Sequence, residues 1–175
     1  DKEKVWQSID SIDNELSQHL DYAYDDQLGF LTCSPTNVGT GMRASVMMFL
    51  PALTRGGYMD SLSTQLSKIG LTMRGLFGEG SGAAGCMYQI SNQITLGITE
   101  EETLKKLKEA IRQISEKEQM ARKSIQGDEL DRLTDKILRS EGLLKNAYMI
   151  HFYFLQKNWL SSPKDALLKR RQNNE

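Results

Sequence analysis

One long amphipathic segment in the second half of the chain restricts the folds that this sequence can adopt. Thr99 and Glu102 stand three residues apart, the spacing of a capping box at the start of a helix. An apolar stripe at helical spacing follows, made of Leu104, Leu107, Ile111, Ile114, Ala121 and Ile125. The pattern predicts one helix from about Glu100 to Ser124. A stripe of that length has to be buried, and we expect a core rather than a partner protein to cover it.

The remaining segments alternate between strand-like runs and amphipathic helices. Apolar spacing predicts helices over residues 5–20, 60–69 and 130–142, and strand-like runs cover residues 30–33, 43–50, 71–77 and 86–96. The glycine-rich stretch 78–85 indicates a hairpin-like join between two of these strands. Because the regular alternation of a doubly wound parallel sheet is missing, we predict an α+β fold with a largely antiparallel sheet flanked by helices.

Composition narrows the class of protein. The 175 residues carry 22 Lys and Arg against 23 Asp and Glu, and a net charge of −1 removes the electrostatic argument for a nucleic-acid or anionic-membrane binder. The longest apolar run, Val46–Leu50, is far shorter than the roughly 20 residues that span a bilayer. Two cysteines, Cys33 and Cys86, without a metal-binding spacing favour a reduced, cytoplasmic setting and no metal site.

The glycine-rich stretch also matches a phosphate-binding pattern. Residues 80–85 read G-S-G-A-A-G, the G-x-G-x-x-G pattern of dinucleotide-binding folds. In those folds the last glycine opens a helix, whereas here aromatic and β-branched residues follow it. We therefore favour a loop joining two strands, of the kind that can act as a lid, over a dinucleotide site.

Two arginines and one acid flank the small-residue loops. Arg43 opens a strand after a Gly/Thr loop, and Arg74 lies in the strand before the glycine-rich stretch. A guanidinium stays charged and binds phosphate oxygens bidentately, so the pair suits a polyphosphate cradle; the alternative is two ordinary strand arginines with solvated heads. Glu79 is the only carboxylate of the glycine-rich stretch. Composition alone leaves three roles open, a catalytic base, a group that orients a cationic substrate and a solubilising charge, and favours the last.

Three motifs in a fixed order carry a family resemblance. They are S-P-T-N-V-G-T-G-M-R-A-S-V within residues 28–46, R-G-L-F-G-E-G-S at residues 74–81, and Q-I-S-N-Q at residues 89–93. Together they resemble the catalytic domain of the ATP:guanido phosphotransferases, most closely the bacterial protein-arginine kinase branch. The resemblance runs from about Val5 to Leu144.

The resemblance implies an antiparallel sheet, flanked by helices, that holds ATP through several arginines. It implies Mg²⁺ carried by the nucleotide and transfer of the γ-phosphoryl group to exposed arginine side chains of protein substrates. The residues that match the family's nucleotide-binding segments are Arg43, Ala44, Ser45, Val46, Met47, Arg74, Gly75, Leu76, Phe77, Gly78 and Glu79. Glu79 also matches an acid near the acceptor guanidinium, and Ser34 stands where the family usually has a catalytic cysteine.

The sequence also departs from the family pattern. Cys33 is displaced by one position from the usual cysteine, and strand alternation would point it to the opposite face from Ser34. Gly82 replaces a second loop acid that many members carry. The S-S-R-x-R and N-E-E-D-H motifs are not among the 175 residues, and we expect them upstream; an R-D-x-x-R-A motif is missing from residues 148–175.

Two functional hypotheses follow. In the first, residues 1–147 are part of a guanido-kinase-like catalytic domain, residues 148–175 are a C-terminal helical extension, and the chain is inactive by itself. In the second, the chain belongs to a degenerate, non-catalytic homologue that acts as a nucleotide-binding or regulatory module. The aromatic residues after position 147 leave a homodimer contact open.

Overall fold

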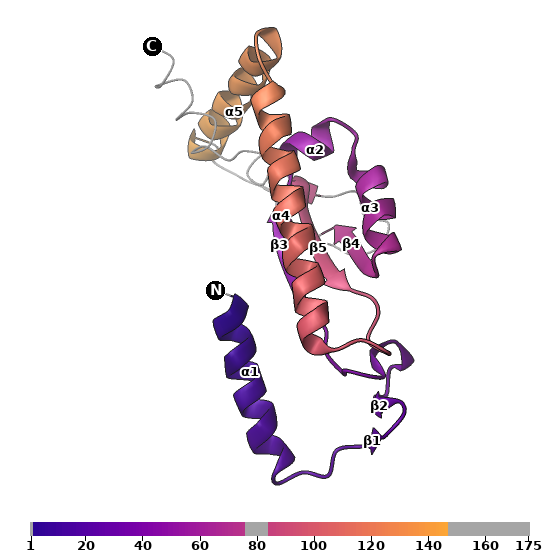
Figure 1. Cartoon of the computed structure of the whole chain (residues 1–175). Helices are drawn as coiled ribbons and strands as arrows, with labels where there is room; N and C mark the ends of the chain where they lie inside the picture. The colour runs from indigo at the N-terminus through magenta and orange to yellow at the C-terminus, as the bar shows by residue number, and fades with distance from the viewer. Residues whose placement is uncertain (1, 76–83, 147–175) are drawn as a thin grey trace. The chain divides into compact units, whose positions relative to one another are not determined.

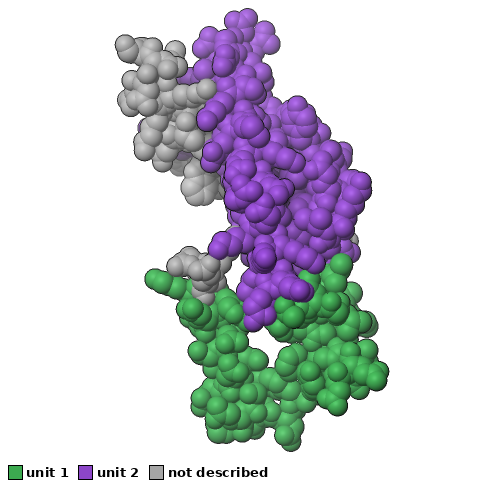
Figure 2. Space-filling model, viewed as in Figure 1, with its two compact units in different colours: residues 1–43, 94–100 green, residues 44–93, 101–175 purple. Residues whose placement is uncertain are grey.

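A computed structural model describes residues 2–75 and 84–146 (Figure 1). The elements in chain order are α1 (Lys2–Ser17), β1 (Tyr24–Asp25), β2 (Gly29–Phe30), the 3₁₀ helix η1 (Pro35–Asn37), β3 (Ser45–Phe49), α2 (Pro51–Arg55), α3 (Met59–Lys68), β4 (Leu71–Gly75), the 3₁₀ helix η2 (Ala84–Cys86), β5 (Met87–Asn92), α4 (Glu100–Ser124) and α5 (Asp128–Asn146). They form two compact units, one of residues 1–43 with 94–100 and one of residues 44–93 with the chain from 101 onward (Figure 2).

The second unit is built on a three-stranded antiparallel sheet in the order β3-β5-β4. The predicted antiparallel sheet and its helices are therefore confirmed. Ile90 pairs with Val46 on one side and Met73 on the other. Because side chains alternate along a strand, these three residues share one face with Met48 and Tyr88. That face is the apolar one, since Ile90 is completely buried.

Helices α3 and α4 cover this apolar face (Figure 1). Helix α4 contributes Leu107, Ala110 and Ile114, all at most 6% exposed, and the half-buried Ile111 and Ala121 pack against the same cluster. Most of the predicted stripe therefore faces a core. Helix α3 adds Leu62 and Leu66 to the same cluster. Burial of side chains of this size contributes roughly 1.5–3 kcal/mol each, which fixes both helices on the sheet.

A buried carboxylate on α4 forms hydrogen bonds with the first turn of α2, which follows β3. Glu118 is 4% exposed, and its two oxygens accept the backbone N–H groups of Ala52 and Leu53, each at 3.0 Å. These N–H groups belong to the first turn of α2, where helical partners are lacking. Arg122 Nε donates to the same carboxylate at 2.7 Å, and its guanidinium lies 5.9 Å from the centre of the Phe49 ring. Glu118, with its partner Arg122, therefore connects α4 to α2 and to β3.

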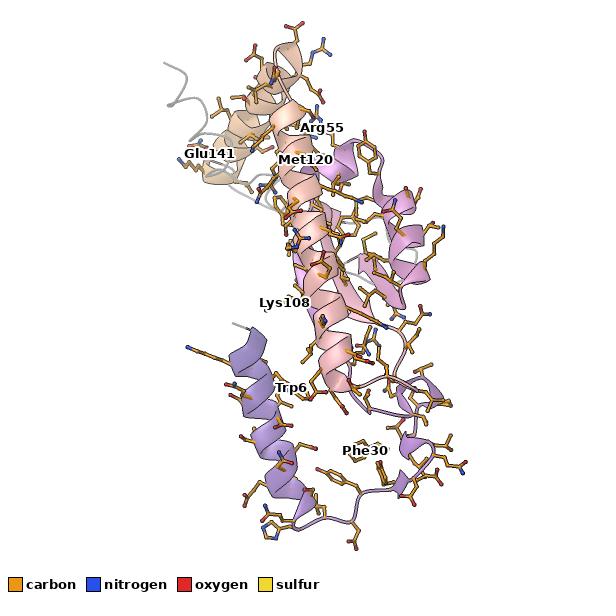
Figure 3. All side chains as sticks on the ribbon, viewed as in Figure 1. Trp6, Phe30, Arg55, Lys108, Met120 and Glu141 are labelled. Atoms are coloured by element: carbon orange, nitrogen blue, oxygen red, sulfur yellow. The ribbon has the colours of Figure 1, made fainter. Side chains whose placement is uncertain are left out.

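The first unit holds α1, the β1–β2 hairpin and the loop that follows it. Tyr22 and Tyr24 both meet the ring of Phe30 edge-on, with ring centres 5.8 and 5.2 Å away. Phe30 is labelled in Figure 3. The predicted helix near the N-terminus is confirmed as α1, although its apolar side chains Val5, Ile9, Ile12 and Leu16 are exposed. None of the helices among the described residues is long and apolar enough to cross a membrane.

Several element boundaries differ from the sequence-based expectation. The strand predicted over residues 30–33 is limited to Gly29–Phe30, and the one predicted over residues 86–96 ends at Asn92. Helix α5 continues through Gly142 to Asn146. The short helix α2 was not expected, because Pro51 indicated only the end of a strand; proline is equally suited to the first turn of a helix.

Replacing Glu118 by Ala should destabilise the protein by about 3 kcal/mol, because two helix-terminal N–H groups and Arg122 lose their buried acceptor. Urea unfolding followed by circular dichroism measures the change. Glu116→Ala is the matched control, since this acid lies on the same helix but is exposed and pairs with Arg112 at the surface. A loss below about 0.5 kcal/mol is expected there. Equal losses for both variants would contradict the role of Glu118.

Candidate active site

The face of the sheet opposite the helices carries Ser45, Met47, Thr72, Arg74, Gln89 and Ser91, all of them polar except Met47. Three of the candidate nucleotide residues, Ser45, Met47 and Arg74, are among them. Strand register aligns them in two rows, Ser45–Ser91–Thr72 and Met47–Gln89–Arg74. Paired residues of antiparallel strands project to the same side, so each row presents three side chains together.

The register places the two predicted nucleotide segments on either side of one strand. Met47 and Arg74 both pair with Gln89, so their backbones are two strand spacings apart, roughly 10 Å. Arg74 is half-buried and Met47 is 41% exposed. The structure thus brings Ala44–Met47 and Arg74–Gly75 into one sheet, as a shared site requires. Gln89 lies between them, although the sequence-based analysis assigned it no role.

Arg43 is exposed and lies two residues before β3, so the expectation that it opens the strand was wrong. The next residue, Ala44, is held at both of its backbone groups by Asn92. The N–H of Ala44 donates to Asn92 Oδ1 at 2.8 Å, and its carbonyl accepts the Asn92 N–H at 3.3 Å. The start of the Arg43–Met47 segment is therefore anchored to the end of β5.

Ser34 lies in a turn of the first unit, where side-chain hydrogen bonds hold the backbone. Its hydroxyl is exposed and lies 2.8 Å from the Thr36 hydroxyl, and its carbonyl accepts the Thr32 hydroxyl at 2.6 Å. Cys33 is also exposed. Because β2 ends at Phe30, both residues lie outside any strand, and the expectation that strand alternation separates their side chains was wrong.

The loop that follows Ser34 has no space for a side chain at Gly39. A Cβ atom on Gly39 would lie 2.1 Å from the carbonyl oxygen of Thr95, and the backbone has a φ of +113°. On its other side Gly39 exchanges two backbone hydrogen bonds with Phe30, at 2.8 and 3.2 Å. The glycine of the V-G-T-G motif is therefore needed for both conformation and space.

The predicted residues Leu76, Phe77, Gly78 and Glu79 lie outside the described residues, as does Gly82. At the edge of that stretch, Cys86 has a φ of +57° and is half-buried, and burial raises the pKa of its thiol. Burial also raises the pKa of Tyr88, whose hydroxyl lies 3.1 Å from that of Thr54. Among residues 2–75 and 84–146 there is no group of three or more His, Cys, Asp or Glu that suits a metal ion.

Comparison with known proteins identifies the family. The profile of the ATP:guanido phosphotransferase C-terminal catalytic domain matches residues 1–121. The chain belongs to this family. A protein-arginine kinase of Clostridium acetobutylicum is 48% identical over 148 residues, covering 85% of this chain and 44% of the relative. One from Desulforamulus reducens is 45% identical over 144 residues, covering 82% and 40%. The chain thus spans less than half the length of these relatives.

Two solved kinase structures have a similar fold. A crystal structure of lombricine kinase has a TM-score of 0.56 and 29% identity, covering 67% of this chain and 32% of that one. The substrate-free duplicated taurocyamine kinase of Schistosoma mansoni has a TM-score of 0.61 and 29% identity, covering 78% and 20%. These comparisons confirm the resemblance stated from the three motifs, and with it the mixed helical and antiparallel architecture.

Replacing Gly39 by Ala should disrupt the loop, because the new methyl group would overlap the Thr95 carbonyl as well as strain the backbone. We expect a loss of about 3 kcal/mol in unfolding free energy, measured by thermal denaturation. Gly127→Ala is the control, since Gly127 also has a positive φ of +58° but has nothing within 4 Å of its Cβ position. The backbone strain alone should cost about 1 kcal/mol. A Gly39 variant no less stable than the Gly127 variant would refute the steric account.

Proposed function

We propose that this chain forms part of an enzyme that transfers the γ-phosphoryl group of ATP to arginine side chains of proteins. Membership of the guanido phosphotransferase family supports the reaction class. The choice of acceptor is supported by relatives named protein-arginine kinase, which are 41–48% identical to this chain. The observation that carries the proposal is the alignment of both predicted nucleotide segments beside one strand, β5.

Arg43 and Arg74 are proposed to hold the phosphates of ATP. Phosphoryl transfer requires little covalent chemistry from the protein itself. It depends on the positioning of the substrates and on fixed positive charge around the phosphoryl oxygens. Ala44–Met47 and Arg74–Gly75 supply backbone and side chains on two strands of a rigid sheet. A sheet with one face packed under α3 and α4 keeps such groups in place.

Glu79 and Ser34 are proposed for the acceptor side. The acceptor guanidinium has to lose a proton to a carboxylate for its nitrogen to bond to phosphorus, and Glu79 is the acid assigned to orient this guanidinium. The P–O bond to ADP breaks as the N–P bond forms, so the products are ADP, phosphoarginine and a proton. Ser34 takes the place of a thiol, and a hydroxyl remains protonated at neutral pH, so we expect lower activity than in relatives with cysteine.

The proposal includes ATP with its Mg²⁺ as substrate, and proteins with exposed arginine as acceptors. It places the protein in the cytoplasm. Residues 148–175, predicted as a C-terminal helical extension, lie outside the described residues, and the boundary at 147 and a homodimer contact remain predictions. The 175-residue chain alone is expected not to turn over, because the S-S-R-x-R and N-E-E-D-H motifs, to which the family resemblance assigns further phosphate-binding arginines and a principal catalytic acid, are not among its residues.

The deciding experiment incubates the natural polypeptide that contains this chain with ATP, Mg²⁺ and an arginine-rich protein. Mass spectrometry under mild, non-acidic conditions should detect phosphoarginine. Glu79→Gln should lower the rate by about 100-fold, since misplacing a reacting group by about 1 Å costs on that order. Glu101→Gln, an exposed acid at the start of α4, should leave it unchanged. Nucleotide binding without any phosphoarginine would refute the enzyme and favour the non-catalytic homologue.

A further inference from the structure

We propose that Asn92 and Thr95, at and just after the end of β5, are positioning residues for the two substrates: Thr95 holds the acceptor loop, and Asn92 holds the nucleotide segment. The inference rests on the proposed function and deepens it. It assigns a task to the third sequence motif, Q-I-S-N-Q, and to the threonine that follows it.

Thr95 is 6% exposed and faces the backbone of the Ser34 loop. Its hydroxyl lies 2.8 Å from the carbonyl oxygen of Val38 and 3.0 Å from that of Thr36. One hydroxyl hydrogen serves both acceptors, so the two carbonyls converge on a single donor. In return, the Thr95 carbonyl accepts the N–H of Thr40 at 3.0 Å. Thr95 therefore forms hydrogen bonds with every second residue of the loop from Thr36 to Thr40.

These contacts reach Ser34 through a short and stiff piece of chain. Residues 35–37 form the 3₁₀ helix η1, in which the N–H of Asn37 donates to the Ser34 carbonyl at 2.9 Å. The Thr36 hydroxyl lies 2.8 Å from that of Ser34. A shift of the Thr36 and Val38 carbonyls would therefore move the side chain that is assigned to the acceptor guanidinium.

Asn92 acts on the other substrate. It is 6% exposed, and its side-chain oxygen accepts the N–H of Ala44, the residue next to Arg43. The same Asn92 pairs with Leu71 of β4 in the sheet register. Asn92 therefore fixes Ala44, at the start of β3, relative to the strand that carries Arg74.

Because Thr95 is assigned to the acceptor side and Asn92 to the ATP side, the proposal makes a prediction that a purely structural role would not make. Neither side chain is charged, and neither is assigned to touch the reacting atoms. Loss of the Thr95 hydroxyl should raise the KM for the arginine acceptor, whereas loss of the Asn92 amide should raise the KM for ATP. A general loss of stability would instead lower activity without separating the two KM values.

For Thr95 the test compares Thr95→Val, which keeps the shape and removes the hydroxyl, with Thr95→Ser, which keeps the hydroxyl. In the natural polypeptide Thr95→Val should raise the acceptor KM about tenfold with the ATP KM unchanged, because small misplacements of reacting groups have large effects. Thr95→Ser should restore the acceptor KM. Thr64→Val is the control, since the Thr64 hydroxyl is exposed and donates only within α3.

For Asn92 the variant is Asn92→Leu, similar in size and without an acceptor. The ATP KM should rise about tenfold while the acceptor KM stays within about twofold. If this variant does not fold, the Thr95 pair decides alone. The inference is overturned if Thr95→Val leaves the acceptor KM unchanged, or if either variant raises both KM values equally.

A second readout needs no activity. Hydrogen exchange on the 175-residue chain should show the Thr40 amide exchanging at least about tenfold faster in Thr95→Val, and the Ala44 amide in Asn92→Leu. Unchanged exchange at Thr40 overturns the inference. Absence of phosphoarginine from the natural polypeptide would overturn the proposed function, and amide exchange would still decide whether these residues hold their segments.

Discussion

The pairing of strand β5 with β3 on one side and β4 on the other is the constraint on which the candidate site depends. Both ladders are antiparallel and in register, so Gln89 is flanked by Met47 and Arg74. A shift of either ladder by one residue would turn the polar row toward the helices. Ile90, completely buried beside Gln89, opposes such a shift because it would have to leave the core.

The two faces of this sheet have different roles: one packs in the core, and the other is proposed to bind the nucleotide. One face packs under α3 and α4, and the carboxylate of Glu118 fastens α4 to the turn after β3. The other face carries polar residues and the proposed nucleotide segments. Rigid packing on one side limits the motion of groups on the other, and phosphoryl transfer depends on such positioning. Within the other compact unit, Thr95 holds the Ser34 loop through its hydrogen bonds to Thr36 and Val38.

The sequence predicted the elements whose signals are local. Helix α4 was expected from about Glu100 to Ser124 and found at those residues, because its capping box and its apolar stripe both come from the one segment 99–125. Helix α2 was missed, since its first turn is stabilised by Glu118, more than 60 residues later. The need for glycine at position 39 arises from the distant Thr95 carbonyl. The motifs indicated Arg43 and Arg74, but the place of Gln89 between their strands follows only from register.

The central claim is that Arg43 and Arg74 bind the phosphates of one nucleotide, and ATP affinity in the natural polypeptide tests it most directly. Isothermal titration calorimetry should show that Arg43→Ala and Arg74→Ala each weaken ATP binding at least tenfold, about 1.4 kcal/mol. Adenosine, which has no phosphates, should bind all variants equally, and Arg112→Ala, on the exposed side of α4, should bind ATP normally. Unchanged ATP affinity in either the Arg43 or the Arg74 variant would contradict the account.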